Sequence, residues 1–452
     1  MRHPNPRFAA AVALSLGVTG ACGGGSSKGG QPGSGGASAN GGTAVTGGAA
    51  GSAVAGGTTA MAGTAGTVAP GGASGIAGAQ PGSGGAAGAA AGTGGRGGNA
   101  GSVGVGGAGS NGGGAAGTGG NGATGGASSE PRSCSASGPG LTTCGKSGNE
   151  SCCTSPLVAG GNFSRTYTNS GSGAMGTADP ATVSAFRLDK YEITVGRFRQ
   201  YVKYLNGGGT PPAAGSGKHA HLNGAKGLSD SGASGSFEPG WDAAWNTHIP
   251  SGAGSSAQWN TALKCNKYGT WTDDAGANEL LPMACLNWWE SYAFCIWDGG
   301  FLPSEAEWRF AASGGDEHRQ YPWGATAPGM DSAYAIYDCC YPDKQCRTSG
   351  GPECTGFVNA APVGFASMGV GRYGQLDLVG SMFEWLVDHY APFVSPCADC
   401  AYFTGTSVNR VLPGGGYRSA LTYLVSSNRG SVSYAETFRG DFAVGARCAR
   451  SP

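Results

Sequence analysis

The chain has 452 residues, 27 lysines and arginines against 27 aspartates and glutamates, and 91 glycines. A formal net charge of zero, without a basic stripe that carries interleaved aromatic residues, excludes the usual footprint of a nucleic-acid-binding protein. Most of the glycines precede Ser129, in a stretch with almost no aromatic side chains. Such a stretch cannot bury enough apolar area to offset its chain entropy. We therefore expect a flexible tether over residues 23–130 and a folded region beyond it.

The first residues have the features of an export signal. Arg2 and Arg7 precede the apolar run "FAAAVALSLGV", which is too short to span a bilayer comfortably. The run ends in "TGAC", which puts Cys22 where a bacterial lipoprotein signal has its lipidated cysteine, although Thr19 departs from the usual leucine. We predict a signal peptide over residues 1–22 and a lipid anchor at Cys22 that holds the protein at a membrane of the cell envelope, with the outer membrane favoured. The alternative is a cleaved secretion signal with a leftover thiol.

Cysteine usage agrees with export. Fifteen cysteines are present, and fourteen remain once Cys22 is set aside, an even number that can pair completely outside the reducing cytosol. Ten of them fall into three local groups: 134, 144, 152 and 153 in a lead-in over residues 131–162, then 339, 340, 346 and 354, then the CxxC at 397 and 400. We expect disulfides, with the pairing left open. A zinc site is the alternative for four clustered thiolates.

The first regular elements are expected shortly after the lead-in. "FRLDKYEIT" alternates as a strand does, and the helix that follows begins after Thr194, a natural N-cap. One face of this helix carries Val195, Phe198, Val202 and Leu205. The sequence "NGGG" ends it, and the chain from there to Glu279 is predicted to be loop.

Two more helices carry start signals of the same kind. One begins at Asn287, with Glu290 three residues later, and the next begins at Ser304, with Glu307 three residues later; both spacings are those of a capping box. Glu305 and Glu307 resemble a pair of carboxylates for acid–base work, but residues two apart on a helix point to different faces. We interpret Glu307 as a cap and Glu305 as support for the helix dipole.

Beyond Gly314 the sequence consists of short apolar pieces broken by Gly, Pro and Asp. Helices in the first part of the folded region and irregular loops in the second predict an α+β domain. We expect disulfides and ions to stabilise it in place of regular β-sheet hydrogen bonding. His219 and His221 could be two ligands of one metal, but no third ligand is identifiable.

Six segments occur in an order that resembles the formylglycine-generating enzymes, or sulfatase-modifying factors. They are "DKYEITVGRFRQYV", "NWWESYAFCIWDGGFLPSEAEWRFAASGG", "YPWGATAP", "YGQLDLVGSMFEW", "VLPGGGYRS" and "VGARCAR". The resemblance covers about Phe163 to Arg450 and implies a domain over residues 163–452. It also implies a variant of the C-type lectin-like fold, low in regular secondary structure and, in this chain, rich in disulfides.

Enzymes of this family use O₂ and copper to oxidise a cysteine of a sulfatase to formylglycine. By resemblance, the two copper-binding cysteines would fall on Ser419 and Leu424. A hydroxyl is a poor ligand for Cu(I), which selects soft thiolates, and leucine offers no ligand atom. The next cysteine downstream is Cys448. We therefore expect no copper site here and no formylglycine generation by the copper mechanism.

The resemblance also implies a structural disulfide and a calcium site. Cys448 matches the cysteine that pairs with Cys295. The calcium ligands would be the side chains of Asp377 and Glu384 and the backbone carbonyls of Gly380 and Met382. Oxygen ligands from one tight loop suit this hard cation. The alternative is that Glu384 only accepts hydrogen bonds from backbone amides in a turn.

By resemblance, the groove that receives the substrate in the family's enzymes is the remaining candidate site. Trp385, Arg418 and Tyr423 are expected to line it, although an aromatic residue at position 385 is more often part of a core. We expect a binding module for a peptide, a glycan or an envelope partner.

Two other functions stay open at this point. The first is a true oxidase, or another metal-dependent oxygenase, that uses thiols from elsewhere, such as Cys397 with Cys400 or Cys339 with Cys340. The second is a purely structural surface module.

Overall fold

The computed structural model describes residues 130–452 except 350, 406, 430–432 and 441–442. Cys22, the predicted signal peptide and nearly all of the predicted tether lie outside the described residues. No helix in the described part is long and apolar enough to cross a membrane.

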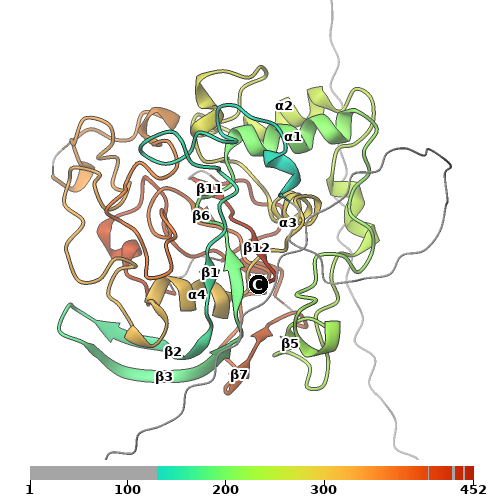
Figure 1. The fold of residues 1–452 in the computed structure, drawn as a ribbon. Helices are drawn as coiled ribbons and strands as arrows, with labels where there is room; N and C mark the ends of the chain where they lie inside the picture. Colours follow the sequence, from blue (N-terminus) through green and yellow to red (C-terminus); the bar gives the residue numbers. More distant parts are fainter. Residues whose placement is uncertain (1–129, 350, 406, 430–432, 441–442) are drawn as a thin grey trace, which may run out of the picture. The chain divides into compact units, whose positions relative to one another are not determined.

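The described residues contain four α-helices (Figure 1): α1 Val195–Asn206, α2 Ser256–Leu263, α3 Trp288–Trp297 and α4 Glu305–Ser313. Three were predicted, and their caps are confirmed: Thr194 accepts from the third residue of α1, and both α3 and α4 have complete capping boxes. The prediction of loop up to Glu279 is wrong at α2. This short helix is stabilised by packing, because Trp259 and Leu263, one turn apart, are fully buried.

The strands are mostly short. The structure has β1 Leu157–Val158, β2 Gly161–Asn169, β3 Ala174–Val183, β4 Phe186–Leu188, β5 Ser229–Asp230, β6 Phe383–Glu384, β7 Cys397–Ala398, β8 Cys400–Ala401, β9 Asn409–Val411, β10 Ser433–Ala435, β11 Val444–Gly445 and β12 Ala449–Arg450. The sheets have the orders β1-β4-β12, β2-β3-β7, β5-β8, β9-β10 and β6-β11. This mixed architecture, with much of the chain in loops, agrees with the predicted α+β class.

Two strand features differ from the sequence prediction. The long antiparallel hairpin of β2 and β3, which curves along one side of the domain in Figure 1, was not predicted. The predicted strand "FRLDKYEIT" is regular only at β4. Its continuation still pairs with the chain end, because the Asp189 amide donates to the Cys448 carbonyl and the Ile193 amide to the Ala446 carbonyl.

Aromatic side chains fill the interior. Phe198 of α1 stacks on Phe294 of α3 with 5.6 Å between ring centroids, and Trp259 of α2 meets Phe198 edge-on at the same distance. A second cluster lies between the hairpin and α4, where Phe163 packs edge-on against Phe310 at 5.3 Å. Large aromatic rings therefore supply much of the buried apolar surface in this domain, which has few regular sheets.

Every cysteine of the described region is in a disulfide. The pairs are 134–153, 144–152, 265–285, 295–448, 339–354, 340–346 and 397–400. The predicted pair of Cys295 with Cys448 is present and ties α3 to the segment before β12. Each of the three local cysteine groups pairs within itself, as disulfides and not as free thiolates for zinc.

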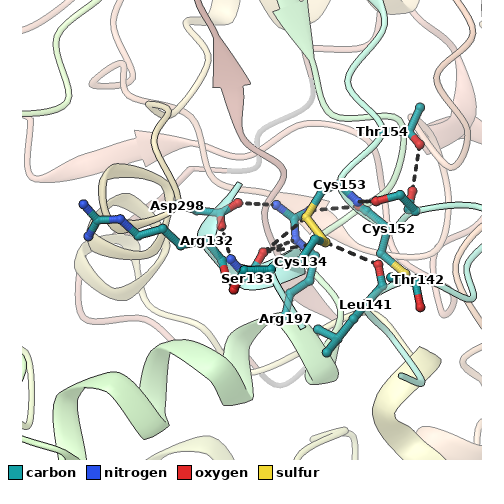
Figure 2. The surroundings of a disulfide bond; sticks show 12 residues. Arg132, Ser133, Cys134, Leu141, Thr142, Cys152, Cys153, Thr154, Arg197 and Asp298 are labelled. Carbon is teal, nitrogen blue, oxygen red and sulfur yellow. Dashed lines mark hydrogen bonds and ion pairs between the residues drawn. A yellow bond between two sulfur atoms is a disulfide. The ribbon is translucent and has the colours of Figure 1, made fainter. Parts of the chain in front are cut away.

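The lead-in is part of the same folded unit. Figure 2 shows the Cys134–Cys153 disulfide beside a buried polar group. The Ser133 amide donates to the Asp298 carboxylate at 2.7 Å, and the Ser133 hydroxyl accepts from Arg197 at 3.0 Å. Arg197 of α1 is itself paired with Asp298 at 2.6 Å, and both side chains are fully buried. Residues 131–162 therefore pack into the domain that the sequence analysis began at residue 163.

Candidate functional site

The segment in which the sequence analysis sought thiols is a tight glycine loop. Gly414 and Gly415 have φ values of 99° and 75°, which favour glycine. A Cβ on Gly415 would lie 2.9 Å from the Cβ of Tyr423. The Gly414 carbonyl accepts from the Gly380 amide, and the Tyr417 amide donates to the Ser381 carbonyl. These contacts hold the loop against the segment that precedes β6.

Ser419 and Leu424 have different surroundings. The Ser419 hydroxyl accepts from the Gly416 amide at 2.9 Å and so closes a turn. Leu424 is fully buried in the cluster beneath α4, while its neighbour Tyr423 is 38% exposed. Neither position offers a soft ligand atom. The residues present here do not fit a Cu(I) centre.

A hollow of about 290 Å³ opens over this loop. Its described lining consists of Arg347, Phe383, Arg418, Ser419, Ala420, Tyr423 and Tyr434. Two of the predicted groove residues, Arg418 and Tyr423, therefore lie in its wall. The prediction for Trp385 is wrong, because this side chain is fully buried in the main core and donates its indole N–H to the Leu286 carbonyl. Phe383 supplies the aromatic wall instead, two residues earlier, with its ring 5.8 Å from that of Tyr423.

A second, smaller hollow adjoins the first. It has a volume of about 10 Å³, and its described lining is Phe383, Leu412, Pro413, Gly414, Gly415, Tyr423, Asn428 and Arg429. Phe383 and Tyr423 belong to both hollows. We call the larger hollow the Phe383–Tyr423 groove, after the two residues that it shares with the smaller one.

A loop closed by two disulfides forms one end of this groove. The pairs Cys339–Cys354 and Cys340–Cys346 close it. Its Asp338 amide donates to the Ser419 carbonyl at 2.9 Å, and its Cys339 amide donates to the Tyr417 carbonyl at the same distance. Backbone pairing thus joins the disulfide loop to the glycine loop.

Arg347 is the side chain that the disulfide loop brings into the groove. It donates to the Arg418 carbonyl at 3.1 Å and lies 3.5 Å from the buried carboxylate of Asp338. Arg418 in turn stacks over the ring of Tyr268, with 4.0 Å from its guanidinium carbon to the ring centroid. Both guanidinium groups are therefore held in place by protein contacts.

The residues expected to bind calcium, 377–384, lie in β6 and in the segment just before it. Glu384 is fully buried, and its oxygens accept from Arg447, with distances of 2.7–2.9 Å, and from the indole of Trp308 at 2.8 Å. One oxygen of Asp377 accepts from the Gly364 amide at 2.6 Å. Glu192 accepts from the Met382 amide and the Ser381 hydroxyl.

The charges of this cluster do not balance. Burial, with the repulsion of Asp377 and Glu384, raises the pKa of Glu192 well above its ordinary value. Burial also raises the pKa of Asp377 to about 6. With all three carboxyl groups ionised, they would face one guanidinium, that of Arg447, and an additional cation beside them would favour that ionised state. The charge and the oxygen donors fit calcium, but both oxygens of Glu384 already have partners.

The other motifs that the sequence analysis considered lie elsewhere. His219 is fully buried, with one ring nitrogen 3.0 Å from Glu238 and the other 3.0 Å from Glu307, the N3 residue of α4. It therefore serves as a structural link within the protein. The Cys397–Cys400 disulfide belongs to β7 and β8, and Cys400 lies 3.9 Å from the Arg165 guanidinium. None of these residues lines the Phe383–Tyr423 groove.

Several residues of the site were missed from sequence. Arg347 stands in a loop without periodicity, and Phe383 and Tyr434 look like ordinary strand residues. Glu192 had a weak signal, since an acidic side chain in "DKYEIT" is unusual for a segment that becomes fully buried. Only the three-dimensional arrangement identifies these four residues as part of the site.

A protein-family model matches more than half of the chain. The family described as "Sulfatase-modifying factor enzyme 1-like domain" matches residues 142–452. The formylglycine-generating enzyme of Mus musculus is 27% identical over 234 residues, which cover 47% of this chain and 55% of that enzyme. The inactive C-alpha-formylglycine-generating enzyme 2 of Mus musculus is 33% identical over 112 residues, covering 25% of this chain and 33% of that protein.

Among solved structures, PvdO from Pseudomonas aeruginosa matches with a TM-score of 0.39 and 16% identity, covering 70% of this chain and all of that one. The chain spans about half the length of the mouse formylglycine-generating enzyme, and a smaller share of its inactive relative.

Proposed function

Because the chain belongs to the family of sulfatase-modifying factor enzyme 1-like domains, we propose that it is a binding module that keeps the family's groove without copper-dependent oxidation. The observation that carries this proposal is the identity of the residues at two positions. A serine whose hydroxyl closes a turn and a leucine buried in the core stand at 419 and 424. Copper(I) needs thiolates there.

Two further observations support a binding role. The Phe383–Tyr423 groove has a pocket of about 290 Å³ with aromatic and charged walls, a composition typical of binding sites. One of the relatives is named as an inactive member. The ligand class is a peptide, a glycan or an envelope protein, and the groove is the surface that would receive it.

We also propose calcium as a structural cofactor. The carboxylate of Asp377 and the carbonyls of Gly380 and Met382 would hold it, and Glu384 would contribute charge while remaining paired with Arg447. Calcium supplies no chemistry to this proposal beyond neutralising the buried carboxylates. The expected place of the protein is the bacterial envelope, exported and anchored through Cys22.

The proposal is tested by titrating the full chain, with its disulfides formed, with Cu(I) against a chromophoric chelator. We expect no uptake that competes with the chelator, and no metal-dependent consumption of oxygen. Tight one-to-one uptake would overturn the proposal. Loss of that uptake in Cys397→Ser/Cys400→Ser or Cys339→Ser/Cys340→Ser would show which displaced thiols carry an oxidase site.

Ligand binding distinguishes this proposed binding module from the alternative, a purely structural module. If substitution of Tyr423 by alanine removes binding of a peptide or glycan while the protein stays folded, the groove is a binding site. If no peptide or glycan from a broad array binds, the structural role is the better description.

A further inference from the structure

We infer that a separate hollow beside the lead-in binds a phosphate monoester of a small polar molecule, with the phosphate held by Arg132 and Arg187. The hollow has a volume of about 600 Å³, and its described lining comes from the start of the lead-in, from β4, from the residues after α3 and from the chain at and after β12. None of its described lining residues belongs to the Phe383–Tyr423 groove. The inference therefore concerns a second site.

The size and the lining of this hollow favour a polar ligand larger than an ion. Its volume lies in the range of small-molecule sites, so a bare phosphate ion would leave most of it to water. Apart from Pro131 and Pro452, its described lining contains no aliphatic and no aromatic side chain. An apolar molecule would therefore lose little contact with water on entering.

Two of the lining arginines lie side by side on the outer face of a sheet. Arg187 of β4 stands directly opposite Arg450 of β12, so both side chains point to the same face. Phe186 and Leu188, on either side of Arg187, are fully buried, and this alternation puts Arg187 on the outer face. Like charges in such a cross-strand pair repel each other. Each guanidinium therefore needs a negative partner.

Only one of these two arginines has such a partner. Arg450 is paired with Asp189 at 3.0 Å and with Asp298 at 2.7 Å. Arg187 donates to the Ser155 carbonyl at 3.0 Å, and it has no ion-pair partner among the described residues. A carbonyl does not neutralise a guanidinium, so an anion beside Arg187 would form charge-assisted hydrogen bonds with it.

Arg132 brings a second guanidinium to the same hollow from the lead-in. Its neighbour Ser133 is held by Asp298, and the next residue, Cys134, is joined to Cys153, so the backbone that carries Arg132 is fixed. Figure 2 shows the Arg132 side chain extending away from this disulfide. The side chain has no ion-pair partner within the described part of the chain. Two such guanidiniums suit the two charges and three oxygens of a phosphate monoester.

The test is calorimetric titration of the full chain, with its disulfides formed, in a phosphate-free buffer of low salt. The probes are glucose 6-phosphate, inorganic phosphate, glucuronate and glucose. We expect glucose 6-phosphate to bind about tenfold more tightly than glucuronate, as one additional charge-assisted hydrogen bond permits. Inorganic phosphate should bind more weakly than glucose 6-phosphate, and glucose should not bind at millimolar concentration. The affinity should fall as salt is raised.

Variants assign the binding to residues. Arg187→Gln and Arg132→Gln should each reduce the affinity for glucose 6-phosphate about tenfold. The matched control is Arg372→Gln, which removes a guanidinium paired with Asp316 and Glu317 outside the hollow and should change nothing. Thermal unfolding checks that each variant is folded.

A second kind of variant should strengthen binding, which a folding defect would not do. Glu130 belongs to the described lining and is exposed, so Glu130→Gln should raise the affinity about threefold by removing a repelling charge. Pro452 also lines the hollow. Extending the chain by Gly-Gly, which replaces a carboxylate at Pro452 by a neutral amide, should act in the same direction.

The outcomes separate this inference from the proposed function. Inorganic phosphate that binds as tightly as glucose 6-phosphate would overturn the larger ligand, and glucuronate that binds as tightly would overturn the phosphate. Binding that survives both arginine substitutions, or no binding of any charged probe at millimolar concentration, would overturn the site. Tyr423→Ala should leave glucose 6-phosphate binding intact. The copper titration therefore tests the proposed function independently.

Discussion

Arg447 binds Glu384 through two of its nitrogens, with the shortest contact at 2.7 Å, and both side chains are completely buried. The same guanidinium donates to the carbonyls of Asp189, Lys190 and Leu376. Arg447 therefore joins the C-terminal segment to β6 and to the chain at residues 189–190 and 376. The pair also sets the charge of the carboxylate cluster beside it.

Substituting the two partners of this pair should have unequal effects. Arg447→Met leaves Glu384, with Glu192 and Asp377 nearby, without a positive partner, and we expect a loss of about 3–5 kcal/mol in the free energy of unfolding. Glu384→Gln should cost less, because the other two carboxylates still face Arg447. Urea unfolding at pH 7 measures both. Equal losses would show that the neighbouring carboxylates do not share the charge of Arg447.

Calcium should stabilise the folded protein. Because the cation would neutralise buried carboxylates, millimolar calcium is expected to raise the midpoint of thermal unfolding above its value in chelator, as binding to the native state alone requires. Asp377→Ala should abolish this shift. Asp343→Ala, at an exposed position outside the cluster, should leave it intact. An unchanged midpoint in the wild-type protein would contradict the calcium proposal.

His219 should make stability fall as pH rises. Burial alone lowers the pKa of His219, but the charges and hydrogen bonds of Glu238 and Glu307 outweigh it and raise the pKa to about 10. The unfolded histidine titrates near 6.5. The stabilisation is therefore complete below about pH 6.5 and is lost progressively as the pH rises through 10.

The measurement is the free energy of unfolding between pH 6 and 10. His219→Gln should lower stability most at the acidic end and flatten the slope. His221→Gln is the matched control, because burial lowers the pKa of His221 and it is neutral over most of that range. Parallel curves for wild type and His219→Gln would refute a protonated His219.

Disulfides of different span should differ in their effect on stability. Cys295–Cys448 joins residues 153 apart and Cys397–Cys400 joins residues three apart. On the loop-entropy account, replacing the first pair by alanines costs about 5 kcal/mol and replacing the second about 2 kcal/mol. Urea unfolding without reductant compares the two double variants. A larger loss for the CxxC pair would indicate that native-state packing, not chain entropy, dominates there.

Local sequence rules predicted the helices that have strong start signals. Thr194, Asn287 and Ser304 cap α1, α3 and α4 as expected, because an N-cap contact depends on only four consecutive residues. They failed at α2, which lacks a capping hydrogen bond and depends on burial of Trp259. The hairpin of β2 and β3 was missed because most of β3 is exposed and shows no apolar alternation.

The sequence by itself determined that no thiol stands at positions 419 and 424, where the resemblance places the family's copper-binding cysteines. Chemical identity at positions 419 and 424 needs no coordinates, because no conformation turns serine or leucine into a thiolate. It also determined that the fourteen cysteines other than Cys22 can all pair, and the resemblance predicted the disulfide between Cys295 and Cys448 that the structure contains.

Only the tertiary structure decided which side chains form the groove. Trp385 and Phe383 are two residues apart in sequence and both belong to the main core, yet only Phe383, which is 5% exposed, also reaches the wall of the hollow. Arg347 reaches Arg418 across 71 residues because a disulfide-closed loop pairs with the glycine loop. Such relationships depend on long-range packing, and local periodicity carries no information about which distant loops meet.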